Sequence, residues 1–271
     1  MEIASALRQE FPHCEVVPYG SFRSGFAFDN CDLDVFTKLG YSIKAKSRQS
    51  FNVRGPQEKA CVVAEVLRRN ERFKFAAAII DTRTPIVQVT DRPTGIRLDL
   101  NPSSEKGVKN CEFLKFLKNY DRRCEHLVKL VKYFAVKHRI NRTGSLPHFN
   151  SYTIVLMVVF FLQSKDILPS VASLQQDVPE QICEGCNFAF DKERRSCGEN
   201  HPELSISQLL LEFFQFYIRF IFSQDMVSPL TGTTARKIQM FRNDDVVVQD
   251  PFEVGRNVAG NVNQINMAHM L

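Results

Sequence analysis

The sequence predicts an α+β protein in two parts, a mixed sheet with helices followed by a mostly helical region. Before about residue 105, short apolar runs alternate with turn signals, whereas after it long apolar patterns of helical period dominate. A hydrophobic content of 44% over 271 residues is enough to bury a core. We therefore expect one region over residues 12–104 and a second over residues 105–271, with an amino-terminal helix, residues 1–11, packing on the second.

The first region is expected to form an antiparallel-rich mixed sheet. A helical pattern covers residues 56–73 and lies between strand-like runs. These runs are residues 14–21, 33–40, 76–95 and 96–104.

The second region is expected to be built from long helices. Helical patterns cover residues 108–139, 151–163 and 203–222, and the polar residues 175–203 are expected to form a loop or insertion. The longest apolar run, residues 153–162, is shorter than the roughly 20 residues that cross a bilayer. It is therefore expected to be a buried core helix, and no membrane partner is expected.

Charge and cysteine content restrict the class of protein only loosely. The formal net charge is +5, which suits a polyanionic partner without requiring one. Eight cysteines are scattered along the chain and no secretory signal opens it, so we expect reduced thiols in an intracellular compartment. Neither a P-loop nor a GxGxxG motif is present.

A short stretch near the amino terminus carries the residues that predict chemistry. The pair Gly20-Ser21 is followed, in an apolar setting, by Asp32-Leu33-Asp34. Side chains at i and i+2 of a strand point the same way, so the two carboxylates are expected on one face. Like charges on one face repel unless a cation lies between them, and such oxygen ligands suit Mg²⁺ or Mn²⁺.

A third carboxylate, Asp99, is expected on a second strand between Leu98 and Leu100. Three carboxylates could hold two ions, and such ions can activate an attacking hydroxyl and neutralise the leaving oxygen at phosphorus. Gly20 would let the backbone approach closely, and Ser21 could hold the terminal phosphates of a nucleotide. An Asp-x-Asp triplet alone could be a solvated strand end or turn, but its combination with Gly-Ser and Asp99 favours a metal site.

These motifs, in this order, resemble the terminal RNA nucleotidyltransferases of the DNA polymerase beta superfamily. The resemblance covers nearly the whole chain, from FPHCEVVPYGSFRSGFAFDNCDLDVFTKLG through RPTGIRLDLN, GVKNCEFLKFLKNYDRR and NSYTIVLMVVFFLQSKDILPS to VVVQDPFEVGRNVAGNV. It extends to the mitochondrial poly(A) polymerases and to the speckle-targeted enzymes that add adenylate or uridylate. It implies a nucleotidyltransferase palm followed by a helical poly(A)-polymerase-associated domain.

The resemblance also implies a role for individual residues. The metal ligands and catalytic carboxylates would be Asp32, Asp34 and Asp99, with Asp99 helping to activate the 3′ hydroxyl of the RNA. The nucleotide-binding residues would be Gly20, Ser21, Asn110, Lys132, Ser151, Tyr152 and Arg256.

Several of these nucleotide-binding residues have a plainer interpretation. Asn110, which would meet the sugar, could simply be a helix N-cap. Lys132, which would meet the triphosphate, lies three residues after Lys129 and could be solvated like it. Tyr152, whose ring would stack on the base, could be an ordinary core residue.

Two departures from the family leave base choice and triphosphate affinity open. Some relatives have a second lysine one helical turn after the one that matches Lys132. This chain has Val136 at that position. Uridylate-selective relatives often carry a histidine where this chain has Arg256, and a guanidinium donates hydrogen bonds but cannot accept them. Both ATP and UTP therefore remain candidate substrates.

The resemblance implies template-independent addition of AMP or UMP to an RNA 3′ end. A pseudoenzyme that serves as an RNA-binding or polymerase-partner scaffold is an alternative, although all three aspartates are intact. A second alternative is transfer to a non-RNA acceptor. No RNA-recognition motif is evident in the sequence, so a protein partner or a dimer could be needed for RNA selection.

A cysteine-rich segment raises the question of a structural zinc ion. Cys183, Cys186, Cys197 and His201 follow a C-x2-C-x10-C-x3-H pattern. The alternative is a loop whose thiols are only packed, and the sequence does not choose between the two.

Overall fold

The computed structural model describes residues 2–29, 31–40, 55–140, 149–195, 204–263 and 267. The chain divides into two compact units, Met1–Lys115 and Phe116–Leu271. This division falls later than the predicted boundary after residue 104, because one helix, α4 (Lys106–Tyr120), runs across it. In the described ranges, no helix has the length and apolar content needed to cross a membrane.

The first unit is built on a five-stranded sheet with strand order β1-β2-β5-β4-β3. The β2–β5 pair is parallel and the other three pairs are antiparallel, which confirms the predicted mixed sheet. The elements that precede α4 are α1 (Glu2–Arg8), β1 (Glu15–Pro18), α2 (Gly20–Ser24), β2 (Leu33–Lys38), α3 (Pro56–Arg69), β3 (Phe73–Ile79), β4 (Ile86–Asp91) and β5 (Arg97–Asn101).

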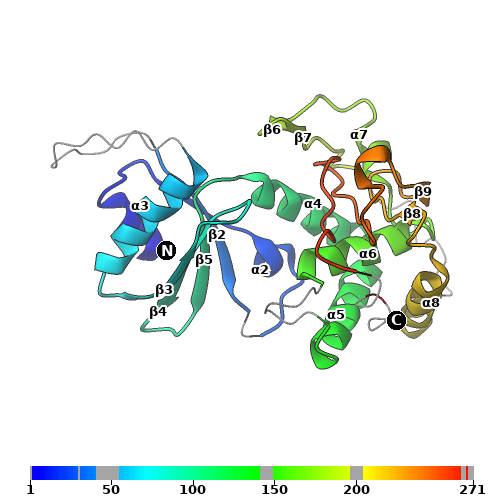
Figure 1. The fold of residues 1–271 in the computed structure, drawn as a ribbon, viewed down its shortest axis with the longest axis horizontal. Coiled ribbons are helices and arrows are strands. Elements are labelled where there is room, and N and C mark those ends of the chain that lie inside the picture. The colour runs from blue at the N-terminus through cyan, green and yellow to red at the C-terminus, as the bar shows by residue number, and fades with distance from the viewer. Residues whose placement is uncertain are drawn as a thin grey trace. The chain divides into compact units, whose positions relative to one another are not determined.

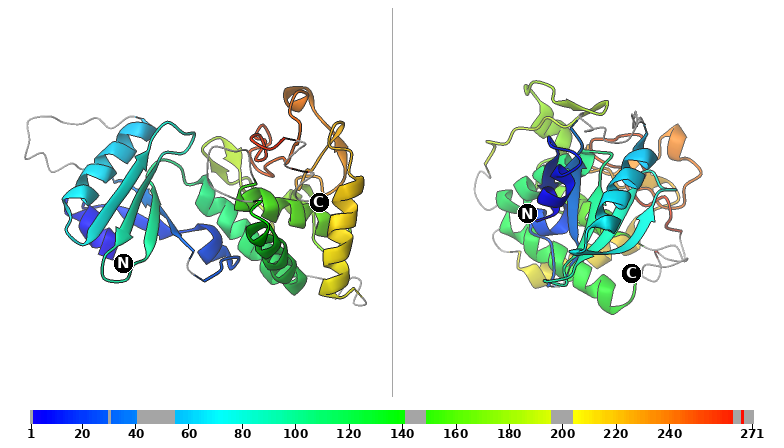
Figure 2. Two further views of the ribbon diagram at one scale, coloured as in Figure 1. Left: turned by 60° about the horizontal axis from the view of Figure 1, so that its bottom comes forward. Right: turned by 90° about the vertical axis from the view of Figure 1, so that its left-hand side faces the viewer.

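The core of the first unit lies between one face of this sheet and the helices α1 and α3 (Figures 1 and 2). Strands β4 and β5 alternate buried and less buried residues, so Val87, Val89 and Leu100 enter the core while their neighbours face the other way. This leaves the opposite face of the sheet available for polar side chains.

The expectation that residues 1–11 pack on the helical region is wrong. Ile3, Leu7 and Phe11 lie in the same core cluster as the α3 residues Val63 and Leu67. An apolar stripe of helical period predicts that a helix buries one face, but it does not say against which surface. Here α1 is followed directly by β1, and the nearest apolar surface is that of the sheet and α3.

The second unit is organised around α6 (Ser151–Gln163), which packs against α5 (Arg122–Lys137) and α8 (Ile206–Arg219) (Figure 1). Residues 153–163 of α6 are all buried, which confirms the predicted core helix. The remaining elements are α7 (Val171–Gln175), β6 (Ile182–Cys183), β7 (Cys186–Asn187), β8 (Asp225–Met226), β9 (Ala235–Arg236) and the 3-10 helix η1 (Gln239–Phe241).

The continuous helical pattern over residues 108–139 is divided in the structure into α4 and α5. Asp121 stands between them in an extended conformation, and its side chain accepts a hydrogen bond from Arg123 N at 2.8 Å. A side-chain cap of this kind satisfies a first-turn N–H group that would otherwise lack a partner. Apolar periodicity continues through the break, which is why the pattern did not reveal it.

Candidate active site

The three aspartates predicted to bind metal are placed by two neighbouring strands. Asp34 on β2 and Asp99 on β5 are direct partners in the parallel ladder. Asp32 comes immediately before β2 and two residues before Asp34, so strand alternation directs it to the same side. The other face of these strands carries Val35 and Leu98, which are buried in the core. The three carboxylates therefore project from the open face of the sheet.

Asp99 lies in an environment that disfavours its negative charge. Burial raises its pKa above the usual aspartate range, and the charge of Asp32 adds to this. A hydrogen bond from Gln88 Nε2 at 3.1 Å and the positive charge of Arg97 act in the opposite direction. A carboxylate of raised pKa beside other carboxylates is suited to accept a proton or to bind a cation.

Asp32 is paired with an arginine on the neighbouring strand. Its Oδ1 atom lies 2.5 Å from Arg97 Nε, in an ion pair whose angles are not those of a hydrogen bond. This oxygen is buried and has no hydrogen-bond partner among the described residues. It is therefore a hard anionic oxygen whose close contact, among the described residues, is the guanidinium of Arg97.

The three aspartates are residue types that bind divalent cations. In this structure their side chains do not form a coordination group around one point. Within the described ranges, no three His, Cys, Asp or Glu side chains come together in a group that could hold a metal ion. Strand pairing nevertheless puts Asp34 and Asp99 side by side, strand alternation puts Asp32 on the same face, and Asp32 Oδ1 makes no hydrogen bond with a described residue. Carboxylate oxygens of this kind are the ligands that Mg²⁺ and Mn²⁺ prefer.

The Gly20-Ser21 pair, called the Gly-Ser turn below, forms the first turn of the short helix α2, which begins two residues after the end of β1. Gly20 has a φ of +72°, and a Cβ atom at this position would lie 1.9 Å from Asp34 Oδ2. Only glycine therefore lets the backbone pass this close to the carboxylate. The Ser21 hydroxyl is half-buried and forms no hydrogen bond with the part of the chain that the structure describes. It follows Gly20 directly in the chain, and a hydroxyl can donate to an oxygen ligand.

Helix α4 contributes Asn110 and Cys111 to the first unit. Asn110 lies in the second turn of the helix, so the interpretation as an N-cap is wrong. Its Oδ1 atom is buried and lacks a hydrogen-bond partner among the described residues. The neighbouring Cys111 Sγ–H donates to Gly20 O at 3.5 Å, and burial raises the pKa of this thiol to about 11. Cys111 therefore remains protonated and tethers the Gly-Ser turn to α4.

Two residues near the carboxylates were not predicted from the sequence. Tyr19 precedes the Gly-Ser pair, and burial followed by the charge of Asp34 raises the pKa of its phenol strongly. Its ring packs directly over Gly107 of α4. Gln88 faces Asp99 across the β4–β5 ladder. Tyr19 could have been found as the residue directly before the Gly-Ser pair, whereas Gln88 requires the register of a strand pair.

In the second unit, the predicted triphosphate ligand Lys132 is buried. It is only 6% exposed, so the interpretation as a solvated residue is wrong. Lys129 differs from it, because its Nζ lies 2.7 Å from Glu125 Oε1 at the surface of α5. A lysine seldom stays buried without an anionic or polar partner, so Lys132 is distinguished from the other lysines of this helix.

Ser151 and Tyr152 open helix α6, which is capped by Asn150 through a bond from Thr153 N at 2.8 Å. Ser151 is exposed. The Tyr152 hydroxyl donates to Asp250 Oδ2 at 3.3 Å, and burial, with the charge of Asp250, raises the pKa of Tyr152 well above its usual value. Tyr152 therefore keeps its proton and is fixed by a partner 98 residues away in the chain.

Asp250, which sequence reasoning missed, links Tyr152 to Arg256. Arg256 Nη1 lies 3.6 Å from the Asp250 Oδ2 atom that accepts from Tyr152. The other oxygen, Oδ1, accepts from Phe252 N and Glu253 N, each at 3.0 Å. Asp250 is fully buried, and its side chain has partners at both oxygens. The sequence signal was the Asp-Pro-Phe turn, in which an aspartate often accepts from the backbone that follows.

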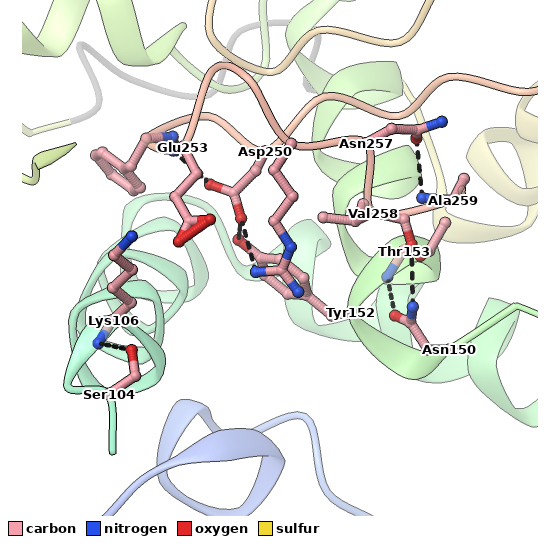
Figure 3. A network of polar contacts seen from close by, with 12 residues as sticks. Ser104, Lys106, Asn150, Tyr152, Thr153, Asp250, Glu253, Asn257, Val258 and Ala259 are labelled. Carbon is pink, nitrogen blue, oxygen red and sulfur yellow. Dashed lines mark hydrogen bonds and ion pairs between the residues drawn. The ribbon is translucent and has the colours of Figure 1, made fainter. Parts of the chain in front are cut away.

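A second set of hydrogen bonds attaches residues 250–259 to the start of α6 (Figure 3). Asn150 Nδ2 and Thr153 Oγ1 both donate to Val258 O, at 3.1 and 2.8 Å. Asn257 Oδ1 accepts from Val248 N and Ala259 N, each at 3.0 Å. These bonds hold the segment that carries Arg256 beside the turn that carries Tyr152.

The zinc hypothesis falls largely outside the described residues. Cys183 and Cys186 are direct partners in the β6–β7 hairpin. Cys197 and His201, the other two members of the pattern, lie outside the described ranges. The described cysteines form no disulfide.

Comparison with known proteins finds one similar protein family and several similar proteins. Residues 1–119 match a protein family described as "Poly(A) RNA polymerase, mitochondrial-like, central palm domain". The chain is 25% identical to the "Speckle targeted PIP5K1A-regulated poly(A) polymerase" of Xenopus tropicalis, over 96% of this chain and 39% of the relative. It is 26% identical to "Terminal uridylyltransferase 7" of Homo sapiens, over 97% of this chain and 18% of the relative. It thus spans less than half the length of these relatives.

A solved structure supports the fold. The crystal structure of mtPAP in complex with ATPgammaS superimposes with a TM-score of 0.86, at 22% sequence identity, over 99% of this chain and 59% of that one. The chain therefore has the polymerase beta-like nucleotidyltransferase fold, as the sequence predicted.

Proposed function

We propose that this chain, a homologue of the poly(A) polymerases and terminal uridylyltransferases, adds nucleotides to the 3′ end of RNA without a template. The observation that carries the proposal is the alignment of Asp34 with Asp99 across β2 and β5, with Asp32 on the same face. Carboxylates that share one face of a sheet are the residue types from which a two-metal phosphoryl-transfer site is built.

The carboxylates would hold one or two divalent cations, Mg²⁺ or Mn²⁺. A bound cation would act as a Lewis acid on the attacking 3′ hydroxyl and the leaving pyrophosphate. Asp99, whose pKa burial raises, is the residue proposed to accept the proton of that hydroxyl. Asp32 and Asp34 are proposed as the remaining ligands.

Each unit contains residues that we propose as contacts of a nucleoside triphosphate. In the first unit, Gly20 lies beside Asp34 and is followed by Ser21, and Asn110 has a buried oxygen that makes no hydrogen bond with the described residues. We assign the terminal phosphates to the Gly-Ser turn and the sugar to Asn110. This assignment uses the buried side-chain oxygen of α4 that has no hydrogen-bond partner among the described residues.

In the second unit, Lys132 is proposed to contact the triphosphate and Ser151 its phosphate or base. Tyr152 is proposed to stack on the base, because Asp250 holds its hydroxyl and leaves the ring as the contact surface. Arg256 is held by the same carboxylate and would donate to the base. Uracil and adenine both offer acceptors to a guanidinium, so we expect modest selectivity between UTP and ATP.

The proposal is tested by extension of a labelled single-stranded RNA with each nucleoside triphosphate in turn and Mg²⁺. We expect a ladder with ATP, UTP or both, and a loss of rate of about a thousandfold or more in Asp99→Asn, because a metal ligand and proton acceptor are removed together. The Asn side chain can still accept from Gln88, so the fold is preserved.

Other outcomes separate the alternatives. A folded protein that binds RNA but extends it with none of the four nucleotides would contradict the enzyme and favour a scaffold. Labelling of a non-RNA acceptor with no RNA extension would move the reaction to another substrate class.

A further inference from the structure

Arg97 occupies a position on the carboxylate face that the proposed reaction does not explain. It opens β5 two residues before Asp99, so both side chains project from the same face of the sheet. Its Nε atom lies 2.5 Å from Oδ1 of Asp32, the residue that directly precedes β2. The cation of Arg97 is therefore in direct contact with one of the proposed metal ligands.

The surroundings of Arg97 argue against a purely structural role. Its side chain is 65% exposed, so it adds little to the core. An ion pair between partly exposed groups stabilises a fold only weakly. The charge of Arg97 also reaches Asp99, where it opposes the effect of Asp32. Arg97 thus offsets the repulsion among carboxylates that share one face.

We propose that Arg97 is an internal counter-ion of the catalytic carboxylates, pairing with Asp32 until a divalent cation displaces it. Arg97 is then a positioning residue that lowers the affinity of the site for the cation and stabilises the palm without it. This inference rests on the proposed role of Asp32 as a metal ligand.

The physical basis is competition for one oxygen. Among the described residues, Asp32 Oδ1 makes no hydrogen bond, and its close contact is with the guanidinium of Arg97, which lies on a largely exposed side chain. A cation bound to Asp32 would lie beside the guanidinium, and like charges at this separation repel. Cation binding must therefore break the ion pair, and the ion pair must weaken cation binding.

The test measures cation binding in the absence of RNA and nucleotide. Mn²⁺ is titrated into the full chain and free Mn²⁺ is followed by electron paramagnetic resonance, together with the melting temperature with and without Mn²⁺. Arg97→Gln is expected to bind Mn²⁺ roughly three- to fivefold more tightly, the factor that a partly exposed ion pair is worth. It should melt lower without Mn²⁺ and gain more from saturating Mn²⁺, since a ligand stabilises the state that it binds.

Matched variants separate the contact from the loss of a charge. Arg92→Gln removes an exposed arginine from the turn between β4 and β5 and should leave Mn²⁺ affinity unchanged. Arg97→Lys keeps the charge and should restore an affinity near that of the wild type. An unchanged or weaker Mn²⁺ affinity in Arg97→Gln would overturn the inference.

Asp34→Asn distinguishes failure of this inference from failure of the proposed function. If the wild type binds Mn²⁺ and Asp34→Asn does not, the metal site stands and the result for Arg97 decides the inference alone. If the wild type shows no Mn²⁺ binding that depends on Asp34, both the metal site and the inference are wrong.

Discussion

The two units hold their candidate site residues by different physical means. In the unit Met1–Lys115, the carboxylates lie on paired strands, and regular alternation and register bring Asp34 and Asp99 together. In the unit Phe116–Leu271, Tyr152 and Arg256 meet only through Asp250, which is 98 residues from Tyr152. The first arrangement follows from backbone regularity, whereas the second depends on individual side-chain hydrogen bonds. The second should therefore be more easily broken by one substitution.

The largest effect on stability is expected from Asp250→Ala. The change leaves two backbone N–H groups and the Tyr152 hydroxyl without their acceptor at a fully buried position. We expect the free energy of unfolding to fall by about 3 kcal/mol, as measured by urea denaturation.

Hydrogen exchange gives the control for this first prediction. Faster exchange should be confined to the start of α6 and residues 246–260, and the sheet of the first unit should be unaffected. Asp250→Asn keeps an acceptor at Oδ1 and should cost about half as much. Equal exchange changes in both units would mean that the two arrangements are not independent.

In the first unit, Gly20→Ala is expected to act on catalysis more than on folding. The new Cβ would lie 1.9 Å from Asp34 Oδ2, and alanine is strained at a φ of +72°. The Asp34 carboxylate must then turn away, so we expect kcat to fall about a hundredfold, or roughly 2.7 kcal/mol in the activation free energy. Steady-state kinetics of RNA extension measure this.

Gly95→Ala is the matched control for the glycine prediction. Gly95 also has a positive φ, +71°, but a Cβ there meets no atom within 4 Å. Gly95→Ala should lower the melting temperature, because alanine is strained in the left-handed conformation, but it should leave kcat unchanged. A similar loss of kcat in both variants would refute the role assigned to the contact with Asp34.

Tyr152→Phe is expected to have a smaller effect in the second unit. The substitution keeps the ring and removes the 3.3 Å hydrogen bond to Asp250. We expect a loss of about 1 kcal/mol in unfolding free energy and a several-fold rise in KM for the nucleotide with little change in kcat. Tyr152→Leu, which removes the ring, should raise KM further; equal KM values in the two variants would argue against stacking.

The smallest effect is expected in the pH dependence of stability. Burial raises the folded-state pKa of Asp99, so its ionisation favours the unfolded chain, and its contribution to stability falls as the pH rises through the usual aspartate range toward the folded pKa. Without divalent cation, Asp99→Asn should therefore be more stable than the wild type at neutral pH, by the smallest margin of these variants. Urea denaturation at several pH values should show this difference vanishing below about pH 4. A less stable Asn variant at neutral pH would contradict the prediction.

The sequence by itself determined much of the first unit. Strand alternation predicted that Asp32 and Asp34 share a face, and the structure aligns Asp34 with Asp99 on a neighbouring strand. It also identified α6 as a core helix, because an uninterrupted apolar run of this length has to be buried. These features follow from short-range periodicity, which can be read from the order of the residues alone.

Only the tertiary structure decided which surfaces and partners meet. It packs α1 on α3 and the sheet, pairs Arg97 with Asp32, places Gln88 against Asp99 and joins Tyr152 to Asp250. Periodicity tells which face of an element is buried but not what covers it, and a hydrogen bond between residues 98 apart depends on the whole path of the chain between them.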